Sequence, residues 1–331
     1  MSTLLIASTG GHLAQLHQLR PRLRGIDPDV TWVTFDTPQS RALLAGEDVV
    51  FVEHTLTRDY RHVITNTVPA AKLLRDRDVT GVVSTGAAIA LSFLPLARAR
   101  RLPTHYIESA TRSSGPSTTG RLLQHVPGIN LYAQHEAWAD DRWSHAGSVF
   151  DGYQARTRRF ARVRRVVVTL GAHRGYGFRR LLERLVAILP PEAEVLWQTG
   201  STDVSGLPID ATPFLPGDEL EAAMRDADLV IGHAGIGSAL AALQAGRCPL
   251  LVPRDPAHGE HVDGHQLEIA AALRDRDLAV VRTVEELDLD DLVLAASTKM
   301  ARTELPPAFA LGDGQGTRPA PTKVASLAAS R

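Results

Sequence analysis

The sequence has little cysteine and no long apolar run. Cys248 is the single cysteine in 331 residues, which excludes an intramolecular disulfide and a cysteine-based zinc site. No segment reaches the roughly 18 consecutive apolar residues of a membrane span. Residues 1–8 lack a basic group and hold only a short apolar run, so they predict a buried first strand rather than a signal peptide. We therefore expect a cytoplasmic protein.

The sequence also lacks an excess of either charge. Its 36 basic and 37 acidic side chains give a net charge of -1 and a pI near 6.9. This balance argues against a nucleic-acid partner, which would need bulk positive charge. A hydrophobic content of 44% is ordinary for a globular protein, and the length suits two domains of roughly 150 residues.

Short apolar runs alternate with amphipathic stretches along the whole chain. The expected strands are 3–8, 30–35, 49–53, 80–84 and 104–107, and then 165–170, 194–198, 228–231, 249–252 and 278–281. Residues 12–24 predict a helix with Leu13, Leu16, Leu19 and Leu23 on one face. Strands separated by helices form parallel sheets. The pattern predicts an α/β protein with two Rossmann-like, doubly wound domains facing a cleft.

The expected boundary lies where the strand pattern restarts. We assign 1–152 to a first domain, 153–164 to a linker, 165–311 to a second domain and 312–331 to a disordered tail. Residues 155–165 hold six arginines and no acid. They indicate either a solvated linker or a contact with phosphate or anionic lipid.

The strongest motif begins at an expected strand ending in Gly232. His233, Ala234, Gly235, Gly237 and Ser238 follow it and lead into a helix. The two glycines allow the backbone to approach a ligand, and Ser238 could cap the helix. A helix start presents free N–H groups and a positive dipole end, as a diphosphate site requires. Further along come Gly246, Pro249 and Arg254, and then a polar loop with His261, His265 and Gln266.

This succession resembles the sugar-nucleotide signature of family 28-like GT-B glycosyltransferases. It is similar to the catalytic subunit of the dolichol-pathway UDP-N-acetylglucosaminyltransferase, its bacterial capsule and exopolysaccharide relatives and, more distantly, the transferase that completes the lipid-linked peptidoglycan precursor. The resemblance implies that His233, Gly235, Gly237 and Ser238 hold the diphosphate and that His265 and Gln266 face the sugar. It also implies a donor-binding role for Gly171, Gln198, Thr199, Gly200, Ala234, Arg254 and His261.

The first half resembles the acceptor-side partner subunit of the same enzyme. The motifs that carry this likeness are Ser8–His12, Tyr106–Ser109 and Pro116–Leu123. The chain is therefore similar to a fusion of two subunits over about residues 3–285. The resemblance implies an acceptor side made of Gly10, Gly11, Thr85, Gly86 and Ser109.

One position departs from the family pattern. The family places a carboxylate eight residues after the histidine of the loop, where it grips the ribose, and this chain has Ala241 there. Gln244, one helical turn later, is a candidate substitute.

Two residues compete for the role of general base. His12 follows two glycines at an expected helix start, where the dipole disfavours the imidazolium and suits a base. Its alternative role is to cap the helix or contact a phosphate. Glu108 is the rival base, or else a buried structural acid.

Metal ligands are sparse in the sequence. His258, His261 and His265 could suggest zinc, but glycine interrupts them and no cysteine helps. The Asp pairs at 76/78, 226/228 and 275/277 precede strands and resemble helix exits. We expect no metal and no other cofactor.

Residues 87–101 form an apolar stretch that ends in arginines and contains Pro95. It predicts a core helix behind the Thr85–Gly86 turn. The alternative is a helix that lies against the cytoplasmic face of a membrane presenting a lipid-linked acceptor.

Together these features predict an inverting, metal-independent hexosyltransferase. The donor would be a nucleoside-diphosphate sugar, with uridine favoured. The resemblance implies that the acceptor is a lipid-diphosphate-linked saccharide in cell-surface polysaccharide assembly. Two alternatives remain open: a nucleotide-sugar 2-epimerase of the same fold, and a non-catalytic donor-binding partner subunit.

Overall fold

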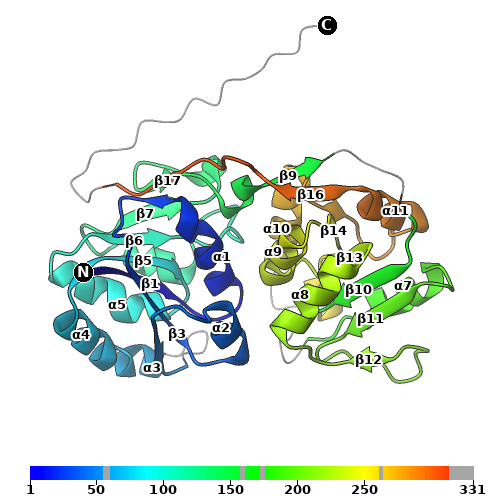
Figure 1. Cartoon of the computed structure of the whole chain (residues 1–331), viewed down its shortest axis with the longest axis horizontal. Coiled ribbons are helices and arrows are strands. Elements are labelled where there is room, and N and C mark those ends of the chain that lie inside the picture. The colour runs from blue at the N-terminus through cyan, green and yellow to red at the C-terminus, as the bar shows by residue number, and fades with distance from the viewer. Residues whose placement is uncertain (55–59, 157–160, 172–175, 261–263, 313–331) are drawn as a thin grey trace, which may run out of the picture.

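A computed structural model describes residues 1–54, 60–156, 161–171, 176–260 and 264–312. Two parallel sheets, one of seven strands and one of six, form the two halves of the molecule (Figure 1). We call the halves the first and the second domain. The predicted fold class is thereby confirmed.

The sheet of the first domain has the order β4-β3-β1-β5-β6-β7-β8, and every pair is parallel. Its strands are β1 Ser2–Ala7, β3 Val30–Phe35, β4 Val49–Val52, β5 Val79–Gly86, β6 Thr104–Ile107, β7 Asn130–Ala133 and β8 Trp143–His145. Leu4 and Ile6 of β1 join one hydrophobic core, whereas Leu5 and Ala7 join another. Both faces of this sheet are therefore covered, as in other parallel sheets.

Six helices pack around the first sheet. They are α1 Gly11–Leu19, α2 Pro38–Leu43, α3 Tyr60–Thr65, α4 Thr67–Asp76, α5 Ile89–Ala99 and α6 Thr118–Leu123, with 3₁₀ turns η1 Arg20–Arg22, η2 Glu136–Trp138 and η3 Val149–Gly152. The helix expected over 12–24 ends at Leu19. Its continuation is the 3₁₀ turn η1, which contains Pro21, and Leu23 lies in a short strand instead.

The helix expected from 87–101 packs in the core of the first domain. Phe93 and Leu94 of α5 are fully buried, as are Ile89, Ala90 and Ala97. The core interpretation is confirmed, and the apolar face of α5 is not available to a membrane. Within the described ranges, no helix has both the length and the apolar character needed to cross a bilayer.

The sheet of the second domain has the order β12-β11-β10-β13-β14-β15 and is also parallel. Its strands are β10 Arg165–Thr169, β11 Glu194–Gln198, β12 Ala211–Thr212, β13 Leu229–Gly232, β14 Pro249–Leu251 and β15 Val280–Val281. The accompanying helices are α7 Arg179–Ile188, α8 Gly217–Asp226, α9 Ile236–Gln244, α10 His265–Arg274 and α11 Leu289–Ser297, with the 3₁₀ turn η4 Pro256–His258.

The chain crosses between the domains twice. On the way out, β9 (Tyr153–Arg156) pairs antiparallel with β16 (Lys299–Arg302). On the way back, β17 (Phe309–Ala310) pairs with β2 (Leu23–Arg24) of the first domain, as the orange-red segment in Figure 1 shows. The expected linker thus starts with a strand, and the end of the segment assigned to the second domain packs on the first. The domain boundaries themselves stay a prediction.

Candidate functional site

Strand order brings the predicted site residues to two neighbouring places. The order reverses between β1 and β5 in the first sheet, and between β10 and β13 in the second. Ligands of open α/β sheets bind at the carboxyl ends of the strands at such reversals. Helix α1 follows β1 and helix α9 follows β13, and the two helices lie on facing sides of the domain junction (Figure 1).

The starts of α1 and α9 touch. A Cβ atom on Gly11 would lie 2.4 Å from Cγ2 of Ile236 and 3.8 Å from the amide nitrogen of Gly237. Position 11 therefore has no room for a side chain. The preceding Gly10 has a φ of 84°, a left-handed conformation that favours glycine. The turn that leads into α1 and the first turn of α9 are thus in direct contact.

His12 has one ring nitrogen engaged and the other open. Nδ1 lies 2.7 Å from the carbonyl oxygen of Thr85. A carbonyl only accepts hydrogen bonds, so Nδ1 carries the hydrogen of the neutral ring and Nε2 keeps a lone pair. Nε2 has no hydrogen-bond partner among the residues that the structure describes. The half-buried ring is thus in the tautomer that a general base needs.

The pKa of His12 is lowered from its ordinary value of 6.5. Burial is the largest cause; the Thr85 carbonyl and the charge of Glu108 raise the pKa, and Arg112 lowers it. The ring is desolvated because it packs against the Gly86 turn, and this effect acts in the same direction as the dipole of the helix start.

Glu108 is buried, with 1% of its surface exposed, and both of its carboxylate oxygens accept hydrogen bonds. Oε1 accepts from the Ser109 amide at 2.9 Å and from the Tyr106 hydroxyl at 3.3 Å. Oε2 accepts from the amide and the hydroxyl of Ser117 at 2.8 and 2.9 Å. Glu108 therefore ties together the two ends of residues 109–117, which we call the 109–117 loop. This geometry favours the structural role over that of a base.

The side chain of Ser109 is held by Gln15. Nε2 of Gln15 donates to Oγ of Ser109 at 3.0 Å and to the Gly11 carbonyl at 3.1 Å, while its Oε1 accepts from the Ala110 amide at 2.8 Å. Gln134 donates to the same Oε1 at 3.1 Å. We did not identify either glutamine from the sequence. The available signal was a polar residue, Gln15, among the buried leucines of α1.

His233 is enclosed by two glycines. A Cβ atom on Gly235 would lie 2.5 Å from its Nε2, and one on Gly171 would lie 2.8 Å from its Cε1. Only 8% of His233 is exposed, and its Nδ1 lies 3.3 Å from the Thr169 carbonyl. Gly235 of the motif and Gly171 after β10 thus make room for the imidazole, which gives Gly235 a second reason besides the close ligand approach that the sequence predicts. Ala234, which lies between His233 and Gly235 in the sequence, has a φ of 60°.

Helix α9 starts without a side-chain cap. Its N-cap residue is Gly235, and Ser238 is the third helical residue, so the expected capping role of Ser238 is wrong. The backbone turns into the helix directly at Gly235, which leaves the Ser238 hydroxyl half-exposed in the first turn. The first N–H groups of a helix have no intrahelical acceptor, so they are free to bind an anion.

Gln198, Thr199 and Gly200 shape the turn at Gly171. Gln198 is 3% exposed, and its Nε2 donates to the Gly171 carbonyl at 3.0 Å. Thr199 is also buried, and a Cβ atom on Gly200 would lie 2.5 Å from the same carbonyl oxygen. These residues therefore hold the Gly171 turn, which in turn packs against His233.

Arg254 and Gln266 are likewise buried. Nη2 of Arg254 donates to the Leu170 carbonyl at 3.0 Å, and its amide donates to Oε1 of Gln266 at 3.0 Å. Burial lowers the pKa of Arg254, and the charge of Glu260 raises it. The oxygen of Gln266 is therefore engaged by the protein. His265 is the first residue of α10, and His261 lies outside the described residues.

Gln244, the candidate substitute for the ribose carboxylate, lies at the opposite end of α9 from the glycine-rich turn. Ala241 packs toward α8, and Gln244 is the last residue of α9. Gln244 lines a hollow of about 290 Å³ together with His17, Tyr153 and Arg302. It is about 12 Å along the helix axis from the start of α9. Gln244 therefore lies beside this hollow rather than at the start of α9.

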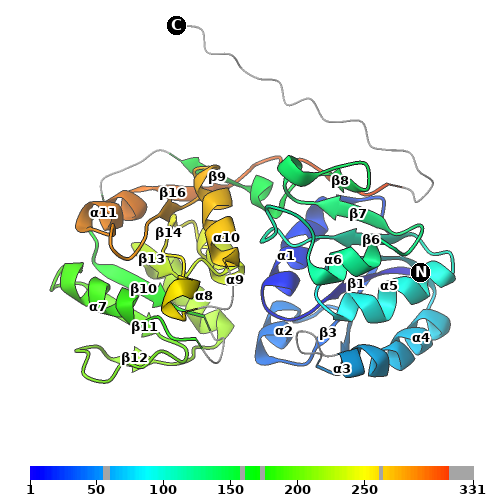
Figure 2. The same ribbon diagram turned by 180° about the vertical axis from the view of Figure 1, so that it is seen from behind.

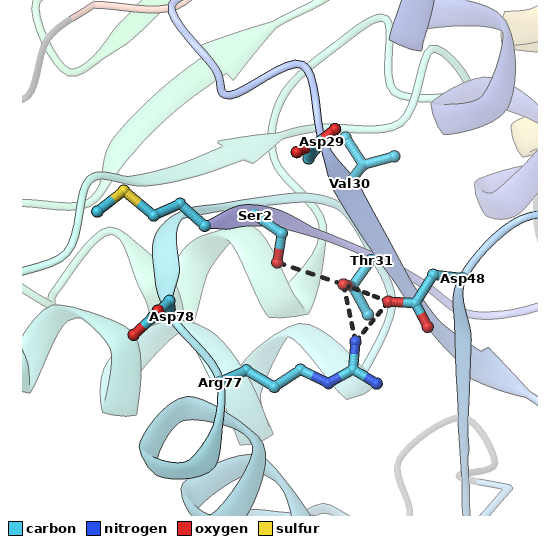
Figure 3. A pocket seen from close by; sticks show the side chains of 8 residues that line it. Ser2, Asp29, Val30, Thr31, Asp48, Arg77 and Asp78 are labelled. Atoms are coloured by element: carbon cyan, nitrogen blue, oxygen red, sulfur yellow. Dashed lines mark hydrogen bonds and ion pairs between the residues drawn. The ribbon is translucent and has the colours of Figure 1, made fainter.

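A larger hollow lies in the first domain, at the opposite end of the strands from the glycine-rich turns. It measures about 560 Å³ and is lined by Ser2, Asp48, Arg77 and neighbouring residues (Figure 3). Arg77 pairs with Asp48 there, and Thr31 bonds to both. The hollow lies at the amino ends of β1 and β3 and contains no predicted site residue.

Of the candidate zinc ligands, His261 and the side chain of His265 lie outside what the structure describes. Among the described residues, no three His, Cys, Asp or Glu side chains are placed to hold an ion. Asp76 and Asp226 are the last residues of α4 and α8, as their sequence context indicated.

The fold is that of a GT-B glycosyltransferase, and comparison with known proteins adds a family match for the second half of the chain. Residues 166–304 match the Glycosyltransferase family 28 C-terminal domain. This match to the second half of the chain confirms the resemblance to family 28-like glycosyltransferases seen in the sequence.

Individual relatives agree. The UDP-N-acetylglucosamine transferase subunit ALG13 of Yarrowia lipolytica is 39% identical over 95 residues, which cover 28% of this chain and 44% of that relative. The match therefore spans less than half of the relative's length. MurG of Acinetobacter baumannii has a TM-score of 0.54 at 20% identity, covering 88% of both chains. SnogD of Streptomyces nogalater has a TM-score of 0.56 at 18% identity, covering 88% of this chain and 90% of its own. At these identities the two structures establish the fold.

Proposed function

We propose that the chain transfers a sugar from a nucleoside-diphosphate sugar to an acceptor hydroxyl, with inversion and without a metal. The observation that carries this proposal is the contact between the start of α1 and the start of α9 at Gly11 and Gly237. It brings an imidazole with an open Nε2 beside a helix start that suits a diphosphate. The proposed base and the proposed leaving-group site therefore lie at two helix starts that are in contact.

In the proposed reaction the donor diphosphate lies against the first turn of α9, with His233 beside it. The acceptor oxygen forms a bond to the anomeric carbon, and its proton passes to Nε2 of His12. The bond from the anomeric carbon to the diphosphate breaks on the opposite side, and the nucleoside diphosphate leaves. The helix N–H groups stabilise the charge that develops there, so no cation is needed.

We infer a UDP-sugar as donor and a lipid-diphosphate-linked saccharide as acceptor. The donor inference is supported by the Yarrowia relative, whose name specifies UDP-N-acetylglucosamine. The acceptor inference rests on the resemblance of the first domain to an acceptor-side subunit. Polysaccharide assembly at the cytoplasmic face of a membrane is part of the same proposal.

Peripheral membrane contact would need a surface other than α5. The exposed side chains of Ile64 and Val68, at 70% and 72%, lie on the adjoining helices α3 and α4. Lys72 follows one turn later and is also exposed. Apolar side chains beside a cation suit the surface of an anionic bilayer.

The experiment is a donor screen followed by a turnover assay. Thermal shift with UDP-, dTDP- and GDP-sugars identifies the donor, and product formation is then measured with lipid-linked and free saccharide acceptors. We expect stabilisation by a UDP-sugar and acceptor-dependent release of UDP. Conversion of the donor to an epimer without acceptor would contradict transfer, and binding without any turnover would indicate a donor-binding subunit.

A further inference from the structure

Besides the contact at Gly11, side-chain hydrogen bonds join the domains near the proposed site. They link Glu268 of α10 to the 109–117 loop of the first domain. Oε2 of Glu268 accepts from the amide of Ser113 at 3.0 Å and from its hydroxyl at 2.9 Å. The hydroxyl of Ser114 lies 3.4 Å from both carboxylate oxygens. In Figure 2, α10 faces the side of the first domain that carries α6.

The 109–117 loop is thus held at two levels. Its base is closed by Glu108, which accepts hydrogen bonds from Ser109 and from Ser117 within the first domain. Its tip is held by Glu268, which belongs to the second domain. The bonds at the tip exist only when the two domains are together, whereas those at the base do not depend on domain position.

The loop tip also bears on His12. Arg112 precedes Ser113, and its positive charge interacts with both His12 and Tyr106. Displacement of the tip would therefore move a cation relative to the imidazole. On the other side, Glu268 lies in the first turn of the helix that begins with His265 and Gln266, the pair expected to face the donor sugar.

We propose that Glu268 is a positioning residue that places the acceptor-side loop only when the donor domain is closed. Its carboxylate couples the helix expected to contact the sugar to the loop that flanks His12. The acceptor would then meet a complete site only in the closed arrangement. This inference rests on the proposed function, and it concerns the order in which the two halves of that site form.

The test compares Glu268→Ala and Glu268→Gln with the wild type, and uses Glu183→Gln as the matched control. Glu183 is an exposed carboxylate on α7 that pairs with Arg179 inside the second domain. We expect Glu268→Ala to raise the KM for the acceptor about ten- to hundredfold, since charge-assisted hydrogen bonds are lost. Donor affinity by calorimetry should change less than about twofold. Glu268→Gln keeps one oxygen that can accept a hydrogen bond, so its KM for the acceptor should lie between those of the wild type and Glu268→Ala. The control Glu183→Gln should match the wild type.

Amide hydrogen exchange separates this inference from the function itself. In the wild type the Ser113 amide should be protected, and Glu268→Ala should speed its exchange about tenfold or more, without any acceptor present. Unchanged exchange together with an unchanged acceptor KM would overturn the role of Glu268 while leaving the transferase intact. A wild type that transfers no sugar, but shows the expected exchange difference, would overturn the proposed function and leave the interdomain contact standing. A positioning role would also be contradicted if Glu268→Ala lowered donor affinity by the same factor by which it raised the KM for the acceptor.

Discussion

His12 and His233 both lie in the connection between a strand and the following helix, His12 in the first turn of α1 and His233 directly after β13, and they differ in what surrounds them. Each follows a strand at the point where its sheet reverses order. His12 is half-buried, with Nδ1 bound to a carbonyl and Nε2 open, whereas His233 is almost fully buried between Gly171 and Gly235. A histidine thus suits proton transfer in the first domain and a fixed hydrogen bond to the donor in the second. Their environment, rather than their position in the motif, separates the two roles.

The largest expected effect comes from His12→Ala. Turnover should fall by about 10²–10⁴, the usual contribution of a positioned general base. Donor affinity should stay close to that of the wild type, because the proposed donor contacts lie in the second domain. Single-turnover kinetics and calorimetry measure the two quantities separately. Equal losses in both would show that His12 binds rather than reacts.

His233→Ala should have the reverse signature. Because Nδ1 of His233 faces the Thr169 carbonyl, its Nε2 can donate to the diphosphate only when the ring is protonated on both nitrogens. The loss of that charge-assisted hydrogen bond costs about 1.5–3 kcal/mol, or about ten- to hundredfold in donor affinity. Calorimetry with the UDP-sugar measures this loss, and circular dichroism checks the fold. Unchanged donor affinity in a folded variant would remove His233 from the donor site.

Gly235→Ala tests whether the glycine exists to accommodate His233. The added Cβ would lie 2.5 Å from Nε2, so we expect a loss of about 1–3 kcal/mol in the free energy of unfolding. The double variant Gly235→Ala/His233→Ala should recover most of that loss, since the clash is gone. Gly217→Ala is the control, because a Cβ there meets nothing within 4 Å. Urea unfolding of the four proteins decides the point; no recovery in the double variant would mean that the glycine serves the backbone alone.

The smallest expected effect is that of chelation. If the start of α9 and His233 stabilise the leaving diphosphate, EDTA should leave turnover unchanged within error. A loss that magnesium or manganese restores would make one of the Asp pairs functional.

Much of the fold could be predicted from the sequence because its strands are buried on both faces. All ten expected strands are present, with ends within a few residues. The additional strands at 23–24, 211–212 and 309–310 have only two residues each, too few for a periodic pattern, and they depend on partners far away in the chain. β9 and β16 have four residues each but likewise depend on partners at opposite ends of the second domain in the sequence. The short strands β7 and β8 were also not predicted.

The candidate site could be predicted in part. Glycine-rich turns after strands indicated the loops at His12 and His233, because backbone geometry at a strand end is a local property. What the glycines accommodate could not be predicted, since the clash at Gly235 involves a side chain folded back onto it. Gln15 and Glu268 were missed because their partners, Ser109 and Ser113, are distant in sequence.

The measurement that tests the assignment of the base most directly is the pH dependence of turnover in the wild type and in Glu108→Gln. Turnover should rise with pH as His12 loses its proton, with a midpoint below 6.5, because burial lowers its pKa. The charge of Glu108 raises that pKa, so its removal should move the midpoint to a lower pH and leave the limb in place. His12→Ala should abolish the limb. A limb that vanishes in Glu108→Gln but persists in His12→Ala would make Glu108 the base and contradict this account.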